Sequence, residues 1–295
     1  MLAVLLLSIL AASMPVHVQA ANQKTTKKTA SKKTTSKKTV AKKTAAKKTT
    51  TQSGKKKTAI QKNGWVKKKN RFYYYHNGKP LKGWQRLSGH TYYFGGNGVQ
   101  RTSWRKIDNS FYCFGPDGGQ NGYLLVNTQK NGITIGSNGK AQNLSGRAAR
   151  KVKAMARISV CMDKIVGNGL AREKRLRRCY DYLRRKVPYR SLTNYRKKDS
   201  NRDLWYVEAF LYYKYADCHM YASAFAYLAN AIGYDNVVLI HALQHSWVRI
   251  NGYYYDVSIG RLSPYSYRLF RMRSYNDMID KYHYKVKTRR NLSKL

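Results

Sequence analysis

Three tryptophans recur at nearly equal intervals in the first half of the chain. Trp65, Trp84 and Trp104 are 19 and 20 residues apart, and an aromatic cluster and an Asn-Gly or Asp-Gly pair follow each of them. A fourth, degraded unit contains Ile133–Ile135. Aromatic residues favour strands, and Asn-Gly supplies the positive φ of a tight turn. One hairpin cannot bury its own aromatic side chains, but stacked hairpins can. The repeat therefore predicts a β-hairpin solenoid over residues 63–141.

The order Gly-Trp, then Tyr-Tyr-Phe, then Asn-Gly resembles the choline-binding or glucan-binding repeats of cell-wall-binding proteins. In that family, aromatic side chains from successive units line the ligand pocket. An aromatic cage holds a quaternary ammonium by cation–π attraction, or stacks on the face of a sugar. The resemblance implies that choline or a glycan of the bacterial wall is a ligand. The alternative is that these rings form only the hydrophobic spine of the repeats. The positions that match the family's aromatics are Trp65, Trp84, Trp104, Tyr74 and Tyr93.

The N-terminal segment predicts secretion. Residues 2–12 are apolar except for Ser8, and the small-x-small ending Val18-Gln19-Ala20 is typical of a signal-peptidase site. The apolar run is too short to span a bilayer. We therefore expect a signal peptide at residues 1–20 and no membrane association after its cleavage. The alternative interpretation is a short buried helix.

A Lys- and Thr-rich segment follows at residues 21–62 and has almost nothing to bury, which predicts a disordered linker. The whole chain carries 58 Lys and Arg against 13 acidic residues, a formal net charge of +45. Such a charge requires a polyanionic partner or a dispersed, solvated surface. Because secretion argues against nucleic acid, we expect teichoic acid of a Gram-positive wall as the polyanion. The alternative role of the segment is a soluble spacer.

The second half of the chain, residues 142–295, changes to a helical pattern followed by short strands. One predicted helix starts at Cys218 with Asp217 as its N-cap, and Gly233 ends it. The helix macrodipole and free N–H groups favour a thiolate at such a position, so we expect a lowered thiol pKa. No CxxC pair occurs among the four cysteines, and neither a metal nor an organic cofactor is expected.

A hairpin around Asn251-Gly252 places an imidazole and a carboxylate together. His245 precedes the first arm, and Asp256 lies near the end of the second arm. In this register Asp256 is a diagonal neighbour of His245 on the same face. A thiol at a helix start, an imidazole and a carboxylate are the groups of nucleophilic acyl transfer.

These residues resemble the transglutaminase-like superfamily, which has a papain-like α+β fold. The similar stretches are D-C-H-M-Y-A, H-S-W-V-R-I and N-G-Y-Y-Y-D-V-S within residues 204–260. The resemblance implies Cys218 as nucleophile, His245 as base and Asp256 as the residue that orients the imidazole. It therefore implies a wall-associated cysteine enzyme that acts on the amide bonds of a peptide or protein, either a peptidase or amidase or a transglutaminase-type acyltransferase.

Two alternatives stay open at this point. The first is a non-catalytic surface adhesin or wall-binding protein whose triad is vestigial. The second is an NlpC/P60-like wall peptidase, a family that also begins a helix with Asp-Cys but normally continues with Ser-Gly, where this chain has His219-Met220.

Overall fold

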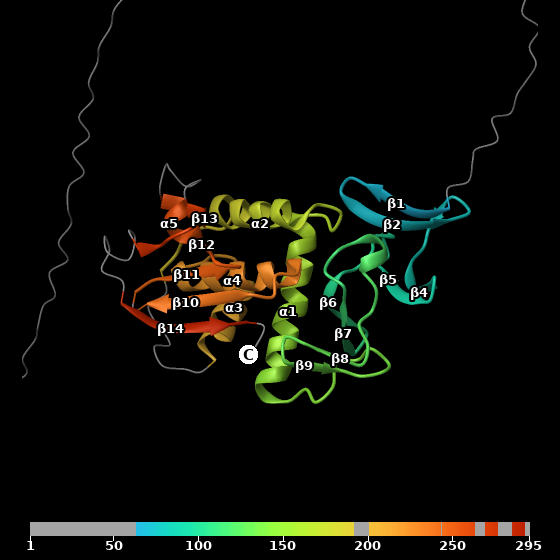
Figure 1. Ribbon diagram of the computed structural model, residues 1–295, viewed down its shortest axis with the longest axis horizontal. Coiled ribbons are helices and arrows are strands. Elements are labelled where there is room, and N and C mark those ends of the chain that lie inside the picture. The colour runs from blue at the N-terminus through green and yellow to red at the C-terminus, as the bar shows by residue number, and fades with distance from the viewer. Residues whose placement is uncertain (1–62, 192–200, 243, 263–268, 277–284, 293–295) are drawn as a thin grey trace, which may run out of the picture. The chain divides into compact units, whose positions relative to one another are not determined.

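Each tryptophan-bearing strand pairs with the aromatic strand of its own unit. The structure, a computed structural model, describes residues 63–191, 201–242, 244–262, 269–276 and 285–292 (Figure 1). The expected signal peptide and the Lys/Thr-rich segment lie outside the described residues. The strands of the repeat region are β1 (Gly64–Lys68), β2 (Arg71–His76), β3 (Lys79–Pro80), β4 (Gly83–Leu87), β5 (His90–Phe94), β6 (Ser103–Ile107), β7 (Ser110–Phe114), β8 (Thr128–Lys130) and β9 (Ile133–Ile135).

The four antiparallel hairpins are β1–β2, β4–β5, β6–β7 and β8–β9. These hairpins confirm a β-hairpin repeat region. Because they form separate small sheets, the expected solenoid stays a prediction. The turn inside the second hairpin is Ser88-Gly89, with φ of 45° and 80°. The pair Asn77-Gly78 instead turns β2 back into β3, with φ of 48° and 77°. Each of the first units thus has two tight turns, and Asn-Gly marks the one after the aromatic strand.

The C-terminal region is α+β, as expected. Its sheet is antiparallel with strand order β13-β12-β11-β10-β14, and helices pack against it (Figure 1). Within the described ranges no helix is long and apolar enough to cross a membrane. The helices are α1 (Gly146–Ile165), α2 (Arg172–Lys186), α3 (Arg202–Tyr213), α4 (Cys218–Ile232) and α5 (Val257–Leu262). The strands are β10 (Val237–Ala242), β11 (Ser246–Ile250), β12 (Tyr253–Tyr255), β13 (Phe270–Met272) and β14 (Val286–Asn291).

Helix α4 is the central element, and its bounds confirm the prediction from sequence. Every residue of α4 is buried, and its alanines allow the neighbouring elements to approach closely. The carboxylate of Asp217 accepts a hydrogen bond from the Met220 N–H at 2.8 Å, which confirms the N-cap. Gly233 ends the helix with a φ of 106°, a conformation that few side chains tolerate. Both ends of α4, and hence the position of Cys218, are therefore fixed by local sequence.

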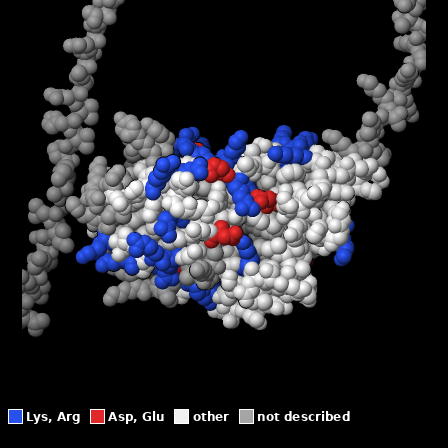
Figure 2. Space-filling model, viewed as in Figure 1, with Lys and Arg blue, Asp and Glu red and all other residues white. Residues whose placement is uncertain are grey.

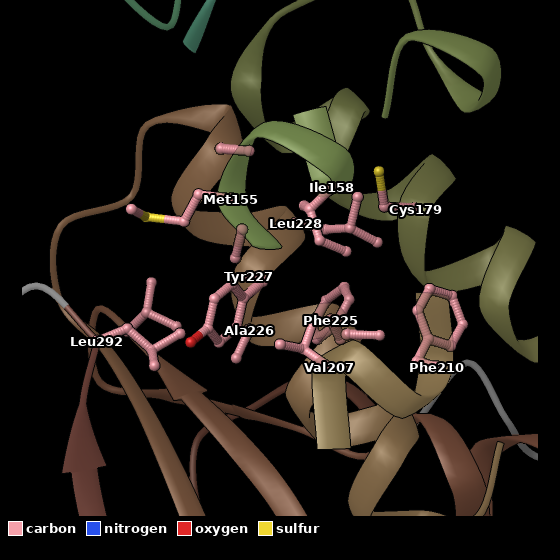
Figure 3. Close-up of a cluster of buried hydrophobic side chains, with 14 of the residues drawn as sticks. Met155, Ile158, Cys179, Val207, Phe210, Phe225, Ala226, Tyr227, Leu228 and Leu292 are labelled. Atoms are coloured by element: carbon pink, nitrogen blue, oxygen red, sulfur yellow. The ribbon is translucent and has the colours of Figure 1, made fainter. Parts of the chain in front are cut away.

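One hydrophobic core joins the helices to the last hairpins. Figure 3 shows Met155 and Ile158 of α1 beside Leu228 of α4, with Leu292 after β14 reaching the same cluster. Trp104 of β6 and Ile133 of β9 belong to this core as well. The third and fourth hairpins therefore pack directly on the helical region. The expected boundary between residues 141 and 142 does not divide the chain into two independent hydrophobic cores.

Candidate active site and aromatic clusters

Cys218 lies in the first turn of α4 and is almost completely buried, with 5% of its surface exposed. Its Sγ is 3.5 Å from the main-chain carbonyl oxygen of Gln244, to which the thiol donates a weak hydrogen bond. Gln244 immediately precedes His245. The fold thus brings the start of α4 to the start of β11, although the two are more than twenty residues apart in sequence.

His245 and Asp256 are in direct contact. His245 Nε2 lies 2.6 Å from Asp256 Oδ2, and both side chains are buried. The predicted hairpin register is present, because Val248 pairs with Tyr255 across β11 and β12. Strand β12 ends at Tyr255, so Asp256 lies one residue beyond it, immediately before α5. The imidazole of His245 and the carboxylate of Asp256 therefore lie together, as expected, and Asp256 occupies the junction between β12 and α5.

The Asp256 carboxylate is surrounded by donors. Oδ2 accepts from the Tyr275 hydroxyl as well as from His245, and Oδ1 accepts from Ser258 Oγ at 3.1 Å and from the Ile259 N–H at 3.0 Å. Burial alone would raise the pKa of Asp256, but the charge of His245 and the hydrogen bonds from His245 and Tyr275 lower it below its ordinary value. Asp256 is therefore a carboxylate at neutral pH.

Two aromatic rings extend from the imidazole to the carboxylate. The Trp247 ring stacks on His245 with centroids 5.9 Å apart, and the Tyr275 ring stacks on Trp247 at 4.5 Å. Tyr275 was not identified from the sequence as part of this site. Nothing in the spacing of the chain's 26 tyrosines distinguishes Tyr275, because its role depends on a contact across the sheet.

The expected lowering of the Cys218 thiol pKa is wrong. Burial, together with the nearby charges of Asp217 and Asp256, raises the pKa of Cys218 to about 12, although the backbone N–H groups at the start of α4 act to lower it. Loss of hydration outweighs the helix dipole because the thiol is enclosed. Cys218 at rest is therefore a thiol.

Iodoacetamide should alkylate Cys218 slowly at neutral pH and faster as pH rises. For a thiol with a raised pKa the thiolate fraction, and with it the rate, increases by about tenfold per pH unit below that pKa. Peptide mass spectrometry would separate the Cys218 rate from that of the half-buried Cys161. A Cys218 rate that stays constant between about pH 6 and pH 9 would instead indicate a thiolate–imidazolium pair.

Two further histidines share one hydroxyl beneath the site. His219 Nδ1 and His241 Nδ1 both hydrogen-bond Ser246 Oγ, the latter at 2.6 Å. His219 also stacks on Tyr206, with centroids 5.0 Å apart. Burial lowers the pKa of His219 to about 3 and that of His241 well below its usual range. Both are neutral, packed side chains.

The aromatic side chains of the repeats form two equivalent clusters. The Trp65 ring lies 5.3 Å from Tyr74 of its own hairpin and 5.1 Å from Tyr92 of the next. The Trp84 ring lies 5.0 Å from Tyr93 of its own hairpin and 4.8 Å from Tyr112 of the next. Trp84 is also 38% exposed and lines a cavity of about 560 Å³. The spacing of the repeat thus places the partly buried Trp65 and the exposed Trp84 each between tyrosines of successive units.

Trp104 departs from this pattern and was wrongly grouped with the ligand-binding aromatics. It is 2% exposed, and its indole N–H donates to Asn131 Oδ1 at 3.0 Å. The residue opposite it is Cys113, where the earlier hairpins have a tyrosine. Because α1 covers this hairpin, Trp104 is a core residue and cannot line a surface pocket. The other four aromatic assignments stay predictions.

The comparison with protein families identifies both parts of the chain. A model of the transglutaminase-like superfamily matches residues 161–254, a range that includes Cys218 and His245. A model of the choline-binding repeat matches residues 81–123, which contain the Trp84 cluster. The chain therefore has a transglutaminase-like domain and choline-binding repeats. A comparison with curated proteins finds no match.

Solved structures similar to this chain include choline-binding proteins of Streptococcus pneumoniae. Choline binding protein F, crystallised with a peptidoglycan analogue, is 30% identical over 27% of this chain and 26% of its own, with a TM-score of 0.25. CbpJ is 30% identical over 27% of each chain, also with a TM-score of 0.25. The choline binding domain of Spr1274 is 26% identical over 28% of this chain and 96% of its own, with a TM-score of 0.25. The matched part spans about a quarter of the length of the first two proteins.

Proposed function

We propose that this protein is a secreted, cell-wall-associated cysteine enzyme that acts on amide bonds and is held at the wall by its aromatic repeats. The observation that carries the proposal is the buried contact between His245 and Asp256, together with a cysteine at the start of a central helix whose Sγ lies 3.5 Å from the carbonyl oxygen of Gln244, the residue before His245. The match to a superfamily of cysteine-dependent enzymes and the match to choline-binding repeats support it. We assign the wall-binding part to residues 63–141 and the enzymatic domain to residues 142–295.

In the proposed reaction the Cys218 thiol transfers its proton to His245 while the sulfur attacks the amide carbonyl carbon. Because His245 Nε2 bonds Asp256, Nδ1 is the ring nitrogen that would take this proton. The tetrahedral adduct then loses the amine, which leaves with the proton from His245, and a thioester remains on Cys218. Water or a second amine attacks the thioester and releases Cys218 as a thiol. Asp256 holds the imidazole and stabilises its protonated form.

The oxyanion of the adduct requires donors near the start of α4. The Cys218 N–H is one of the groups that an α-helix leaves without an intrahelical partner, and it points toward the N-terminal end of the helix axis. We propose it as one oxyanion donor. The same free N–H groups would also stabilise the thiolate that forms when the proton leaves.

We also propose that the Trp84 cluster binds a quaternary ammonium group such as choline. The cavity beside it combines the exposed Trp84 ring with Tyr112 and His90, and no acidic side chain lines it among the described residues. Ring faces, rather than an ion pair, would therefore supply the attraction to the cation. The Trp65 cluster has the same arrangement one unit earlier.

Replacing Trp84 by leucine should weaken choline binding by about 5- to 30-fold, because a desolvated cation–π contact is worth roughly 1–2 kcal/mol. Calorimetric titration with choline would measure the affinity. Tyr182→Leu is the matched control, since Tyr182 is similarly exposed but lies on α2. Equal affinity in the wild-type protein and the Trp84 variant would remove this cluster from the proposal.

The test of the enzymatic proposal uses purified wall, a labelled primary amine and the full chain. Release of new amino termini would indicate hydrolysis, and attachment of the label to wall peptide or protein would indicate acyl transfer. Either product is expected from the wild-type protein. If neither forms although the protein is folded and wall-bound, the enzymatic proposal fails.

A second candidate function is a non-catalytic wall-binding protein with a vestigial triad. The observation in its favour is the burial of Cys218, which raises the thiol pKa to about 12 and encloses the sulfur. The same labelled-amine experiment separates the two candidates, because this one predicts wall binding without any product.

A further inference from the structure

A cationic groove lies where the first three hairpins meet α1. It has a volume of about 600 Å³ and is lined from β2, β5, β6 and α1. It shares no residue with the Cys218 site, and of the aromatic clusters it includes only Tyr93. The charged side chains that line it are Arg71, Arg101, Arg105, Lys106, Lys164 and Asp163.

One carboxylate in this groove faces five cations. Asp163 receives a bidentate ion pair from Arg105, with distances of 2.9 and 3.0 Å, and a third hydrogen bond from Arg101 at 3.0 Å. No other acidic side chain among the described residues lines the groove. Five positive charges and one negative charge leave a net charge of +4 at neutral pH. The carboxylate is already saturated by the two arginines, so the excess charge is not neutralised locally.

Hydrogen-bond donors remain for a ligand. Arg101 uses one terminal nitrogen on Asp163, and Arg71 uses one on the main-chain oxygen of Asp163 at 2.8 Å. A guanidinium has five N–H donors, and within the described part of the chain the structure gives neither arginine another partner. Lys106 and Lys164 are exposed at the same groove. Donors in this number suit a ligand that carries several anionic oxygens.

The rest of the lining is aromatic and aliphatic. Tyr73 and Tyr93 contribute rings, and the half-exposed Val160 of α1 contributes an apolar surface. Ring faces of this kind stack on the C–H face of a sugar. We propose that this groove binds a phosphodiester-linked anionic glycan, whose phosphates pair with the arginines and lysines while a sugar lies on the tyrosines. The site is independent of the proposed triad and supplies wall attachment other than by recognition of a quaternary ammonium.

Charge alone does not define this site, because Lys and Arg are widespread on the protein. Figure 2 shows them gathered over the α+β region of the visible face, with only small acidic patches between them. The test must therefore compare the groove with equally charged positions elsewhere. Lys68 on β1 and Lys174 on α2 are exposed lysines that do not line the groove, so Lys68→Gln/Lys174→Gln is the matched control for Lys106→Gln/Lys164→Gln.

The experiment measures binding of the full chain to a glycosylated glycerol-phosphate oligomer by calorimetry at about 0.15 M salt, where exposed charges are partly screened. Arg71→Gln/Arg101→Gln should weaken binding by about tenfold or more, since each hydrogen bond to a charged group is worth roughly a factor of ten. The Lys106→Gln/Lys164→Gln variant should lose less affinity than the arginine variant, and the affinity of the Lys68→Gln/Lys174→Gln control should stay within about twofold of wild type. The N-terminal Lys-rich segment is common to all variants, so its contribution cancels.

The Arg71→Gln/Arg101→Gln variant also removes contacts with Asp163 on α1 and could therefore loosen the fold. The Lys106→Gln/Lys164→Gln variant does not have this problem, because neither lysine forms an ion pair within the described residues. Equal losses in the groove and control pairs would overturn the proposal in favour of unspecific attraction. A polyglutamate peptide that binds as tightly as the oligomer, and loses the same factor in the groove variants, would overturn the glycan assignment in favour of an acidic peptide.

Discussion

Replacing Cys218 by alanine is expected to abolish amide turnover, with a loss of about 10⁴-fold or more, because removal of a nucleophile eliminates the covalent path. Wall binding should be unchanged, since Cys218 lies at the start of α4 and none of the proposed wall-binding residues contacts it. The loss is measured as product released or amine incorporated per enzyme.

The matched control for this substitution is Cys161→Ala. Cys161 is a half-buried free cysteine on α1, and it should retain wild-type turnover. If the wild-type protein and the Cys218 variant are equally active, the product comes from another group. If both are inactive while wall binding persists, the vestigial triad is the better description.

Replacing Asp256 by asparagine is expected to lower turnover by about 10²- to 10⁴-fold while the protein still folds. The pKa of Asp256 is depressed, so at neutral pH the carboxylate is ionised and stabilises the protonated imidazole of His245. An asparagine whose amide oxygen replaces Oδ1 can still accept the hydrogen bond from the Ile259 N–H. It carries no charge, and its amide nitrogen cannot accept from His245 or Tyr275 at the Oδ2 position. Because Cys218 rests as a thiol, its proton must pass to His245 during the reaction. The rate should therefore depend strongly on the negative charge of Asp256, which stabilises the protonated imidazole.

The control for this second substitution is Asp235→Asn, which alters an exposed carboxylate in an ion pair with Lys130. Exposed pairs of this kind contribute roughly 0–1 kcal/mol, so both folding and turnover should stay near wild type. Thermal unfolding would show whether the Asp256 variant is intact. A loss of less than about tenfold in a folded Asp256 variant would contradict the proposed role of the carboxylate.

The sequence predicted those features whose causes are local. The N-cap Asp217 and the terminal Gly233 define α4 by short-range hydrogen bonding and backbone freedom, and the bounds that they predict are confirmed. The Asn251-Gly252 turn fixes the register of β11 and β12, and that register brings His245 and Asp256 together. Helix capping and hairpin register require only a few neighbouring residues, so a single sequence suffices to predict them.

Features that depend on distant segments were missed or wrong. Tyr275 reaches Asp256 only after β13 joins the sheet, and no spacing in the chain indicates that contact. The thiol pKa of Cys218 depends on how completely its neighbours exclude water, which a helix start alone does not specify. Trp104 follows the repeat in sequence, yet α1 covers it. In each case the deciding neighbour comes from another part of the chain.

The burial of Trp104 has a consequence for how this protein can be divided. Because Trp104, Ile133 and Ile135 are part of the core that also contains α1 and α4, a fragment that begins at residue 142 would leave an apolar face of α1 open to water. The smallest piece able to fold on its own must then begin upstream of β6. The third and fourth hairpins therefore belong to the folded body of the helical region, and we expect insertion or deletion of a repeat to be tolerated only N-terminal to β6.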